Sequence, residues 1–307
     1  MQSTNCILMI EPVNFGFNPQ TAVNNYFQTN DTHRATQEKA LAEFNAFVDL
    51  LRNKGISVFT VKDTESPHTP DSIFPNNWVS FHKNGTVCLY PMFAENRRLE
   101  RREDILKNIE DLGFMINEIV DYSPAEKEGK FLESTGSMIL DHDYKIAYGT
   151  VSLRLDEELF RKWCAEFNYK PVVFHANQTV DGERLPIYHT NVMMCVGSHY
   201  AVICMDSIDD PAERELVDRT LSESKKEIIT ITEEQMNRFA GNMLEVRNDE
   251  GKLFLVMSDS AYRSLTPDQI RKIEAHAEII HPDLHTIETN GGGSARCMMA
   301  EIFLPRK

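Results

Sequence analysis

Three side chains in this sequence have the types that nucleophilic catalysis needs. Cys297 offers a thiol, His189 an imidazole and Glu133 a carboxylate. In such a set the thiolate attacks an electrophilic carbon, the imidazole moves protons, and the carboxylate orients the imidazole. Three consecutive glycines, Gly291 to Gly293, precede Cys297 and allow the backbone to approach a ligand closely. Each residue also has an ordinary structural interpretation: Cys297 as an inert core cysteine, His189 as a surface histidine, and Glu133 as a solvated carboxylate in a turn.

Polar motifs recur along the chain at nearly constant spacing. The residue numbers of Asn77, Glu133, His189, Asn242 and Cys297 differ in turn by 56, 56, 53 and 55. A fixed period of this size is typical of repeat architectures, and modules that close on themselves point the same position of each at one central place. The spacing therefore predicts five modules that bring these five side chains together. The alternative is a chance recurrence of elements in an α/β protein.

Each module reads as polar motif, strand, turn, strand, helix and strand. Apolar residues at helical spacing are followed by a β-rich run four times, and a capping box with proline at its first helical position marks a last helix at 266–269. The expected helices start near residues 40, 99, 156 and 211, and the strands expected outside the hairpins include 114–120 and 298–304. Hairpin turns are expected at 83–85, 141–143, 197–199 and 248–251.

Metal and phosphate chemistry are poorly supported by the same residues. Cys297, His189 and Glu133 could bind zinc, but zinc sites usually have two ligands close in sequence, and no H-E-x-x-H motif occurs. The triple glycine is not followed by Gly-Lys-Ser/Thr and does not open a helix, unlike phosphate-binding loops. We therefore expect no metal and no cofactor. Three further cysteines, Cys88, Cys195 and Cys204, lie within apolar runs and are expected to be inert.

The composition indicates a folded protein with a small-molecule substrate. Hydrophobic residues make up 41% of the 307 residues and charged residues 26%, as in ordinary globular chains. The net charge of -15 disfavours nucleic acid and anionic membranes as partners, and no run approaches the ~20 apolar residues of a membrane span. Six cysteines without paired spacing indicate free thiols and a cytoplasmic location. The oligomeric state stays open, a homo-oligomer included.

Four motifs together resemble the amidinotransferase and arginine deiminase superfamily. The similarity is greatest to the citrulline-utilisation hydrolase type of arginine deiminase-related protein, and it extends from Glu11 to the C-terminus. The motifs are Phe74-Pro75-Asn76-Asn77-Trp78-Val79, Glu133-Ser134-Thr135-Gly136-Ser137-Met138, Tyr188-His189-Thr190-Asn191-Val192-Met193-Met194 and Gly291-Gly292-Gly293-Ser294-Ala295-Arg296-Cys297.

This resemblance implies the pentein fold, a five-bladed α/β propeller of ββαβ modules with pseudo-five-fold symmetry, formed by a single catalytic domain over residues 1–307. It implies that Cys297 is the nucleophile, that His189 is the general acid and base, and that Glu133 orients the histidine and holds a substrate nitrogen. Arg154 matches an arginine that binds the substrate carboxylate in relatives. The threonine that follows this arginine in relatives is replaced here by Leu155.

Two asparagines depart from the pattern of guanidine-processing relatives, which usually have aspartate at both positions. These are Asn77 and Asn191, and Asn76 joins them in the predicted substrate-binding set. A carboxylate binds a guanidinium through charge-assisted forked bonds, whereas an amide offers an acceptor and two donors without charge. The two amides suit a neutral ureido group, and the succinylarginine dihydrolase branch resembles this chain in having asparagine there.

The leading hypothesis is a hydrolase that cleaves a C–N bond of an arginine- or citrulline-like side chain through a covalent cysteine intermediate. The first alternative keeps the fold and the nucleophile but transfers the amidino group of arginine to another amine. The second alternative is a non-catalytic pentein that acts as a binding module. Amino-acid substrates are expected for both enzymatic hypotheses.

Overall fold

Four similar three-stranded sheets form the middle of the chain. In each, an antiparallel hairpin is followed by a helix and by a third strand parallel to the second strand of the hairpin. A parallel neighbour requires such a crossover. The computed structural model describes residues 1–29 and 36–307. The sheets are β3 (Val79–Phe81), β4 (Thr86–Leu89) and β5 (Glu118–Asp121); β6 (Met138–Asp141), β7 (Ile146–Thr150) and β8 (Lys170–Phe174); β11 (Met194–Val196), β12 (Tyr200–Ile203) and β13 (Glu227–Thr230); β14 (Leu244–Arg247), β15 (Leu253–Val256) and β16 (Glu278–Ile280).

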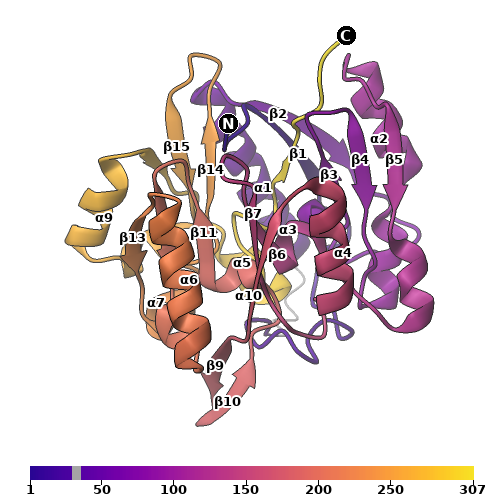
Figure 1. Cartoon of the computed structure of the whole chain (residues 1–307). Coiled ribbons are helices and arrows are strands. Elements are labelled where there is room, and N and C mark those ends of the chain that lie inside the picture. Colours follow the sequence, from indigo (N-terminus) through magenta and orange to yellow (C-terminus); the bar gives the residue numbers. More distant parts are fainter. Residues whose placement is uncertain (30–35) are drawn as a thin grey trace.

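The fifth three-stranded sheet joins segments from opposite ends of the chain. Its strands are β1 (Cys6–Glu11), β2 (Ser57–Lys62) and the short β17 (Ala300–Glu301), in the order β17-β1-β2. Strand β1 pairs with β17 antiparallel and with β2 parallel, so this sheet has the same internal pattern as the other four. A separate hairpin of β9 (Asn177–Val180) and β10 (Glu183–Pro186) projects from the body of the molecule (Figure 1).

One helical connection accompanies each three-stranded sheet, and its sequence shows why it begins where it does. The Asp156 side chain accepts a hydrogen bond from the backbone N–H of Leu159 at the start of α4, and Thr266 and Gln269 form a complete capping box at the start of α9. These starts confirm the predicted helix signals. The connections are α1 (Thr36–Asn53), α2 (Glu103–Asp111), α4 (Glu157–Phe167), α6 (Pro211–Glu223), and α8 (Asp259–Ser264) with α9 (Pro267–Glu274).

Shorter helices complete the described chain, and three of them change the predicted module. The polar motifs do not run straight into strands, because η1, α3 and α5 each insert one helical turn before β3, β6 and β11. The short elements are η1 (Pro75–Asn77), η2 (Glu95–Glu100), η3 (Ser123–Glu128), α3 (Ser134–Ser137), α5 (Thr190–Met193), η4 (Met205–Ser207), α7 (Glu233–Met236) and α10 (His285–Gly291).

Two predicted strands are wrong in extent. The strand expected over 114–120 starts only at Glu118, and Phe114 forms an isolated bridge with Arg306. The strand expected over 298–304 is reduced to β17, because the backbone N–H groups of Cys297, Met298 and Met299 each bond a carbonyl three residues earlier. A β-rich composition therefore coincides here with a turn that presents Cys297.

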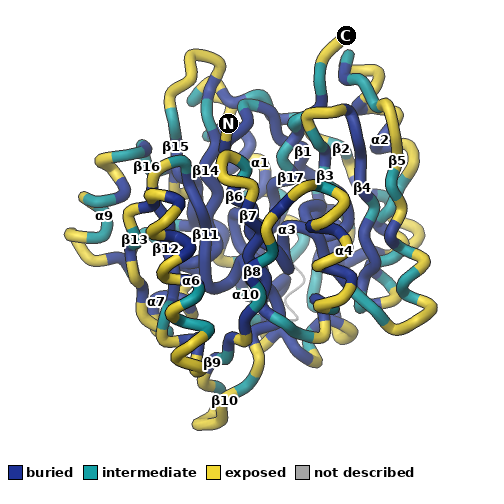
Figure 2. The backbone as a smooth tube through the Cα atoms, in the orientation of Figure 1, coloured by how far each residue is buried: buried dark blue, intermediate teal, exposed yellow. Residues whose placement is uncertain are grey.

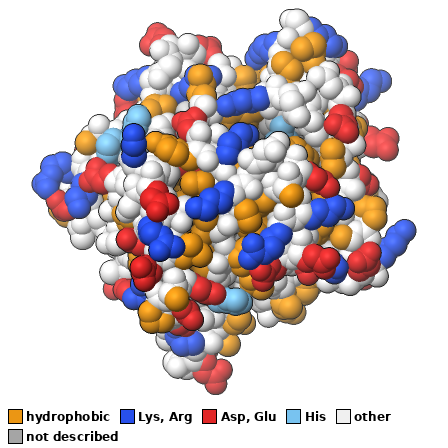
Figure 3. All heavy atoms as spheres, in the orientation of Figure 1, with side chains coloured by type: hydrophobic (Ala, Val, Ile, Leu, Met, Phe, Trp, Pro, Cys, Tyr) orange, Lys and Arg blue, Asp and Glu red, His pale blue; other side chains and the backbone are white. Residues whose placement is uncertain are grey.

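The apolar core follows the sheets and the helix faces packed against them. Buried backbone is concentrated on the central strands, whereas the β9–β10 tip and the outer helix faces are exposed (Figure 2). On the face drawn in Figure 3, acidic and basic side chains are interspersed. Among residues 1–29 and 36–307, no helix has the length and apolarity to cross a bilayer.

Candidate active site

The structure places members of three of the four motifs around one small pocket. Asn77, His189 and Cys297 line it directly. Asn77 ends η1, while Glu133 and His189 each precede a helical turn, α3 and α5. These turns direct the motif side chains inward before the chain enters a strand.

Glu133 and His189 form a buried pair. His189 Nε2 lies 2.7 Å from Glu133 Oε2, and the backbone N–H of Phe93 donates to Glu133 Oε1 at 2.9 Å. Although burial alone would raise the pKa of Glu133, the Arg154 guanidinium and the hydrogen bond from His189 hold that pKa well below its usual value. An ionised carboxylate only accepts hydrogen bonds, so Nε2 carries the imidazole proton. Nδ1 of His189 is then the nitrogen that can accept a proton.

The charge state of His189 follows from its surroundings. Burial lowers its pKa to about 4, and the hydrogen bond and charge of Glu133 raise it by less than burial lowers it. The imidazole is therefore neutral at pH 7 in the unliganded protein. It is ready to take a proton from a thiol and later to deliver that proton to a leaving amine.

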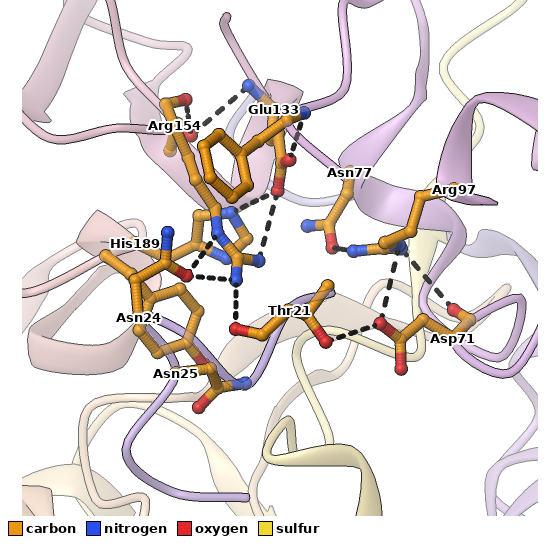
Figure 4. Close-up of polar contacts among 12 residues, drawn as sticks. Thr21, Asn24, Asn25, Asp71, Asn77, Arg97, Glu133, Arg154 and His189 are labelled. Carbon is orange, nitrogen blue, oxygen red and sulfur yellow. Dashed lines mark hydrogen bonds and ion pairs between the residues drawn. The ribbon is translucent and has the colours of Figure 1, made fainter. Parts of the chain in front are cut away.

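Arg154 lies beside this pair and is held from three sides (Figure 4). Its Nη1 lies 3.4 Å from Glu133 Oε2, and its Nη2 donates to the backbone carbonyl of Thr21 at 3.0 Å. Its Nε donates to Asn24 Oδ1 at 3.1 Å. The guanidinium is buried and lines the pocket.

Cys297 is buried, and two asparagine amides contact its sulfur. Asn242 Nδ2 lies 3.2 Å from Cys297 Sγ, and Asn191 Nδ2 lies 3.4 Å from the same atom. Donors of this kind stabilise a negatively charged acceptor. Asn191, predicted to bind substrate, is fully buried and lies against the sulfur rather than among the pocket-lining residues.

Asn77 lines the pocket with its orientation determined by a buried arginine. Arg97 Nη1 donates to Asn77 Oδ1 at 2.7 Å, and Asn77 Nδ2 donates to Asn76 Oδ1 at 3.0 Å. Arg97 itself is paired with both oxygens of Glu100, each at 2.9 Å. Asn76 therefore lies behind Asn77 and does not line the pocket, so its predicted role in substrate binding is at most indirect.

Several polar residues of the site were missed by the sequence reasoning. Arg97 comes from η2, Asp71 from the loop before η1, and Thr21, Asn24 and Asn25 from the segment 18–29, none of which shares the phase of the repeat. Asp71 is buried, accepts from Asn18 and Thr21 through Oδ2, and leaves Oδ1 without a hydrogen-bond partner. Burial raises the pKa of Asp71 against the opposing charge of Arg97. Asn242 also had no predicted role, but the sequence did mark it, because it shares the spacing of the repeat.

The pocket is small. Its volume is about 10 Å³, roughly the space that one water molecule needs. Asn25 Nδ2 and Gln28 Nε2 donate to the carbonyls of Gly292 and Gly291 at 3.1 and 3.0 Å, which holds the segment 18–29 over the loop that precedes Cys297. A substrate must displace side chains or this segment to reach the sulfur.

Gly136 allows the parts of the site to approach one another. A Cβ at this position would collide with the Asn77 amide and would lie 2.9 Å from Cε1 of His189. Real Cβ atoms do not make such contacts, so only glycine permits the η1 motif and the imidazole to meet over α3.

Three other buried thiols are unsuited to nucleophilic chemistry. Burial raises the pKa of Cys88 and of Cys195 to about 12, and Cys204 is raised as well. Thiols of this kind stay protonated and unreactive at neutral pH. Within the described ranges 1–29 and 36–307, no group of three or more His, Cys, Asp and Glu side chains is arranged to hold a metal ion.

Comparisons with known proteins identify a family for this chain. A family model described as N,N dimethylarginine dimethylhydrolase, eukaryotic, matches residues 11–304. A search of curated protein sequences finds no match.

Solved structures of arginine-related enzymes share the fold. ArgZ, an arginine dihydrolase from the ornithine-ammonia cycle in cyanobacteria, aligns with a TM-score of 0.73 and 18% identity over 98% of this chain, which spans 41% of the ArgZ chain. The N-terminal domain of ArgZ bound to product aligns with a TM-score of 0.72 and 19% identity over 98% of this chain and 99% of that domain. The dimethylarginine hydrolase DDAH from Pseudomonas aeruginosa, in complex with citrulline, aligns with a TM-score of 0.68 and 16% identity over 98% of this chain and 100% of that one. The mixed α/β fold of small sheets thus matches pentein structures.

Proposed function

Because the chain belongs to the family of N,N dimethylarginine dimethylhydrolases, we propose that it hydrolyses a C–N bond of a guanidino side chain through a covalent intermediate on Cys297. One observation carries the proposal. A thiol contacted by two amide donors shares a pocket with an imidazole that is neutral and hydrogen-bonded to an ionised carboxylate. That arrangement is the one a cysteine nucleophile and its proton-transfer partner need.

The reaction follows in two steps. His189 takes the thiol proton, and the Cys297 sulfur attacks the central guanidino carbon to form a C–S bond. His189 then gives the proton to one substrate nitrogen, and the C–N bond breaks to release an amine. In the second step, His189 takes a proton from water, the resulting hydroxide adds to the same carbon, and the C–S bond breaks as His189 returns that proton to the leaving sulfur and restores the thiol. The products are a ureido compound and an amine, and one water is consumed.

The charged groups around the pocket support an amino-acid substrate. Arg154 supplies a buried cation for a substrate carboxylate, and the unpaired Oδ1 of Asp71 supplies an acceptor for a substrate ammonium. Glu133, next to the imidazole, is positioned to accept from a guanidino N–H. Arg97, which also lines the pocket, donates to Glu100, Asn77 and a backbone carbonyl and so orients Asn77.

A second candidate is hydrolysis of a neutral ureido group, and the orientation of Asn77 favours it. Because Arg97 bonds Asn77 Oδ1, the side of this amide that remains for a ligand is its N–H₂ group. A donor suits the carbonyl oxygen of a ureido group better than it suits a guanidinium, which has no acceptor. The same site would then first convert a guanidino substrate into a ureido compound and afterwards hydrolyse that ureido compound.

The variant Asn77→Asp tests this choice. Aspartate can still accept from Arg97, and its second oxygen offers an acceptor where the amide offered a donor. We expect kcat/KM for arginine relative to citrulline to rise about 10- to 100-fold, as for a gained charged hydrogen bond. Steady-state kinetics on both compounds measure the ratio. An unchanged ratio would reject the role given to Asn77.

The proposed reaction is tested by following products and the adduct together. The purified chain is incubated with arginine, dimethylarginine, citrulline, agmatine and succinylarginine, and the released ammonia or dimethylamine is quantified. We expect one or more of these compounds to yield a free amine, and rapid acid quenching to leave a substrate-derived mass on the Cys297 peptide. Transfer of the amidino group to an added amine, without hydrolysis, would identify a transferase instead. Absence of turnover on every compound would contradict the proposal.

We also propose that the five three-stranded sheets are the blades of one propeller and that residues 1–307 form a single catalytic domain. Contacts between first strands support this arrangement. Phe81 of β3 forms a bridge with Ile302 next to β17, and β6 contacts β11, which in turn contacts β14. The backbone N–H of Arg247 at the end of β14 donates to the carbonyl of Thr4, just before β1.

A further inference from the structure

We infer that Asn242 is a catalytic residue that stabilises the Cys297 thiolate, an inference that rests on the proposed function. Asn242 follows Ala240 and Gly241 in the loop before β14 and is buried. Its Nδ2 lies 3.2 Å from Cys297 Sγ. It therefore contacts the reacting atom itself.

The orientation of this amide is determined by its other contacts. The backbone N–H of Arg296 donates to Asn242 Oδ1 at 3.1 Å, and Asn242 Nδ2 also donates to the backbone carbonyl of Asn191 at 3.1 Å. A backbone N–H can only donate and a carbonyl can only accept. Rotating the amide by 180° would place oxygen against the Asn191 carbonyl and N–H₂ against the Arg296 N–H, so the N–H₂ group must face the sulfur.

The second amide on the sulfur lacks this constraint. Asn191 Nδ2 is 3.4 Å from Cys297 Sγ, but Asn191 Oδ1 is buried without a hydrogen-bond partner. Among the described residues, no other hydrogen bond of the Asn191 side chain determines which end faces the thiol. Asn242 is therefore the amide whose N–H₂ group is held toward the sulfur by its other hydrogen bonds.

The chain is shaped so that Asn242 can reach this position. A Cβ on Gly241 would collide with the backbone carbonyl of Val192, so only glycine lets this loop pack against α5. The same contact brings Asn242 beside Asn191 and the loop that carries Cys297. Since the Arg296 N–H adjoins Cys297 in sequence, one amide both anchors that loop and donates to the sulfur.

The variant Asn242→Asp separates these two tasks. An aspartate keeps the size of the side chain and an oxygen that accepts from the Arg296 N–H, but it replaces the N–H₂ group with a second acceptor. The change also removes the hydrogen bond to the Asn191 carbonyl, but that loss does not act on the charge of the sulfur, so a purely structural Asn242 predicts an unchanged pH dependence of Cys297 reactivity. A donor to the thiolate predicts a changed one, because a carboxylate repels a negatively charged sulfur.

Alkylation of Cys297 by iodoacetamide is the readout, because it reports the thiolate and needs no substrate. The rate is followed by peptide mass spectrometry from pH 6 to 10. In Asn242→Asp we expect alkylation at pH 7 to be about 10- to 100-fold slower than in the parent protein, the size of one lost hydrogen bond to a charged group. The rate should recover toward pH 10, and kcat should fall while KM changes little.

The matched control is Asn248→Asp, on the β14–β15 turn. Asn248 is also buried, accepts from backbone N–H groups through Oδ1 and donates to the Lys54 carbonyl, but it lies away from the pocket. In Asn248→Asp, Cys297 should be alkylated at the same rate as in the parent protein. Equal alkylation profiles for Asn242→Asp and the parent would overturn the inference. An altered profile together with no turnover by the parent on any substrate would leave the thiolate contact standing and refute the proposed reaction.

Discussion

Replacing Cys297 by alanine is expected to lower kcat at least about 1,000-fold, because no covalent intermediate can form without the sulfur. Substrate binding should persist, since Arg154, Asp71 and Asn77 line the pocket independently of the thiol. Amine release measures turnover, and calorimetric titration of the variant with substrate measures binding. The expected pattern is therefore binding without chemistry.

The matched control for this variant is Cys195→Ala on β11. Cys195 is equally a buried thiol, but it does not line the pocket. Its turnover should stay near that of the parent. If Cys297→Ala retained parental turnover, the covalent mechanism would be refuted.

Replacing Glu133 by glutamine is expected to lower kcat about 100- to 10,000-fold, the usual worth of a positioned proton-transfer group. The ionised Glu133 determines which nitrogen of His189 carries the proton and also neutralises Arg154. Glutamine can present its N–H₂ group to Nε2 of the imidazole. Nε2 then acts as the acceptor and Nδ1 carries the proton, so Nδ1 cannot take a proton from the thiol. Removing the carboxylate also removes the charge that opposes the burial effect, so the pKa of His189 falls further below about 4.

Kinetics over pH 5 to 9 distinguish this effect from misfolding. In Glu133→Gln, kcat should be low across the whole range, while the far-UV circular dichroism spectrum matches that of the parent. The surface variant Glu157→Gln, which loses only an exposed pair with Arg161, serves as control. Similar kcat values in Glu133→Gln and this control would show that the buried carboxylate has no part in proton transfer.

The elements of the fold were predictable where local chemistry determines them. Proline at the first position of α6 and the capping residues of α4 and α9 determine helix starts locally, and all three were predicted. The strand extents at 114–120 and 298–304 were not, because β-rich residues also form turns when their backbone N–H groups bond within a turn, as that of Met298 does, or to a distant segment, as that of Met115 does.

The candidate site was predictable only through its repeat. The common phase of Asn77, Glu133, His189, Asn242 and Cys297 indicated that they converge, and the structure joins Glu133 to His189 and Asn242 to Cys297. Arg97, Asp71 and Asn24 belong to connecting segments whose paths depend on the packing of whole sheets. No spacing in the sequence marks such residues, and the role of Asn77 as a partner of Arg97 could not be deduced without them.

The pairing of β17 with β1 also determines where the sulfur of Cys297 lies. The turn formed by Cys297, Met298 and Met299 leads directly into β17, and β17 is paired with β1 through Leu8 and Ile7. A change that detaches β17 from β1 is therefore expected to shift Cys297, while the hydrogen bond between His189 and Glu133 lies in other sheets and is unaffected.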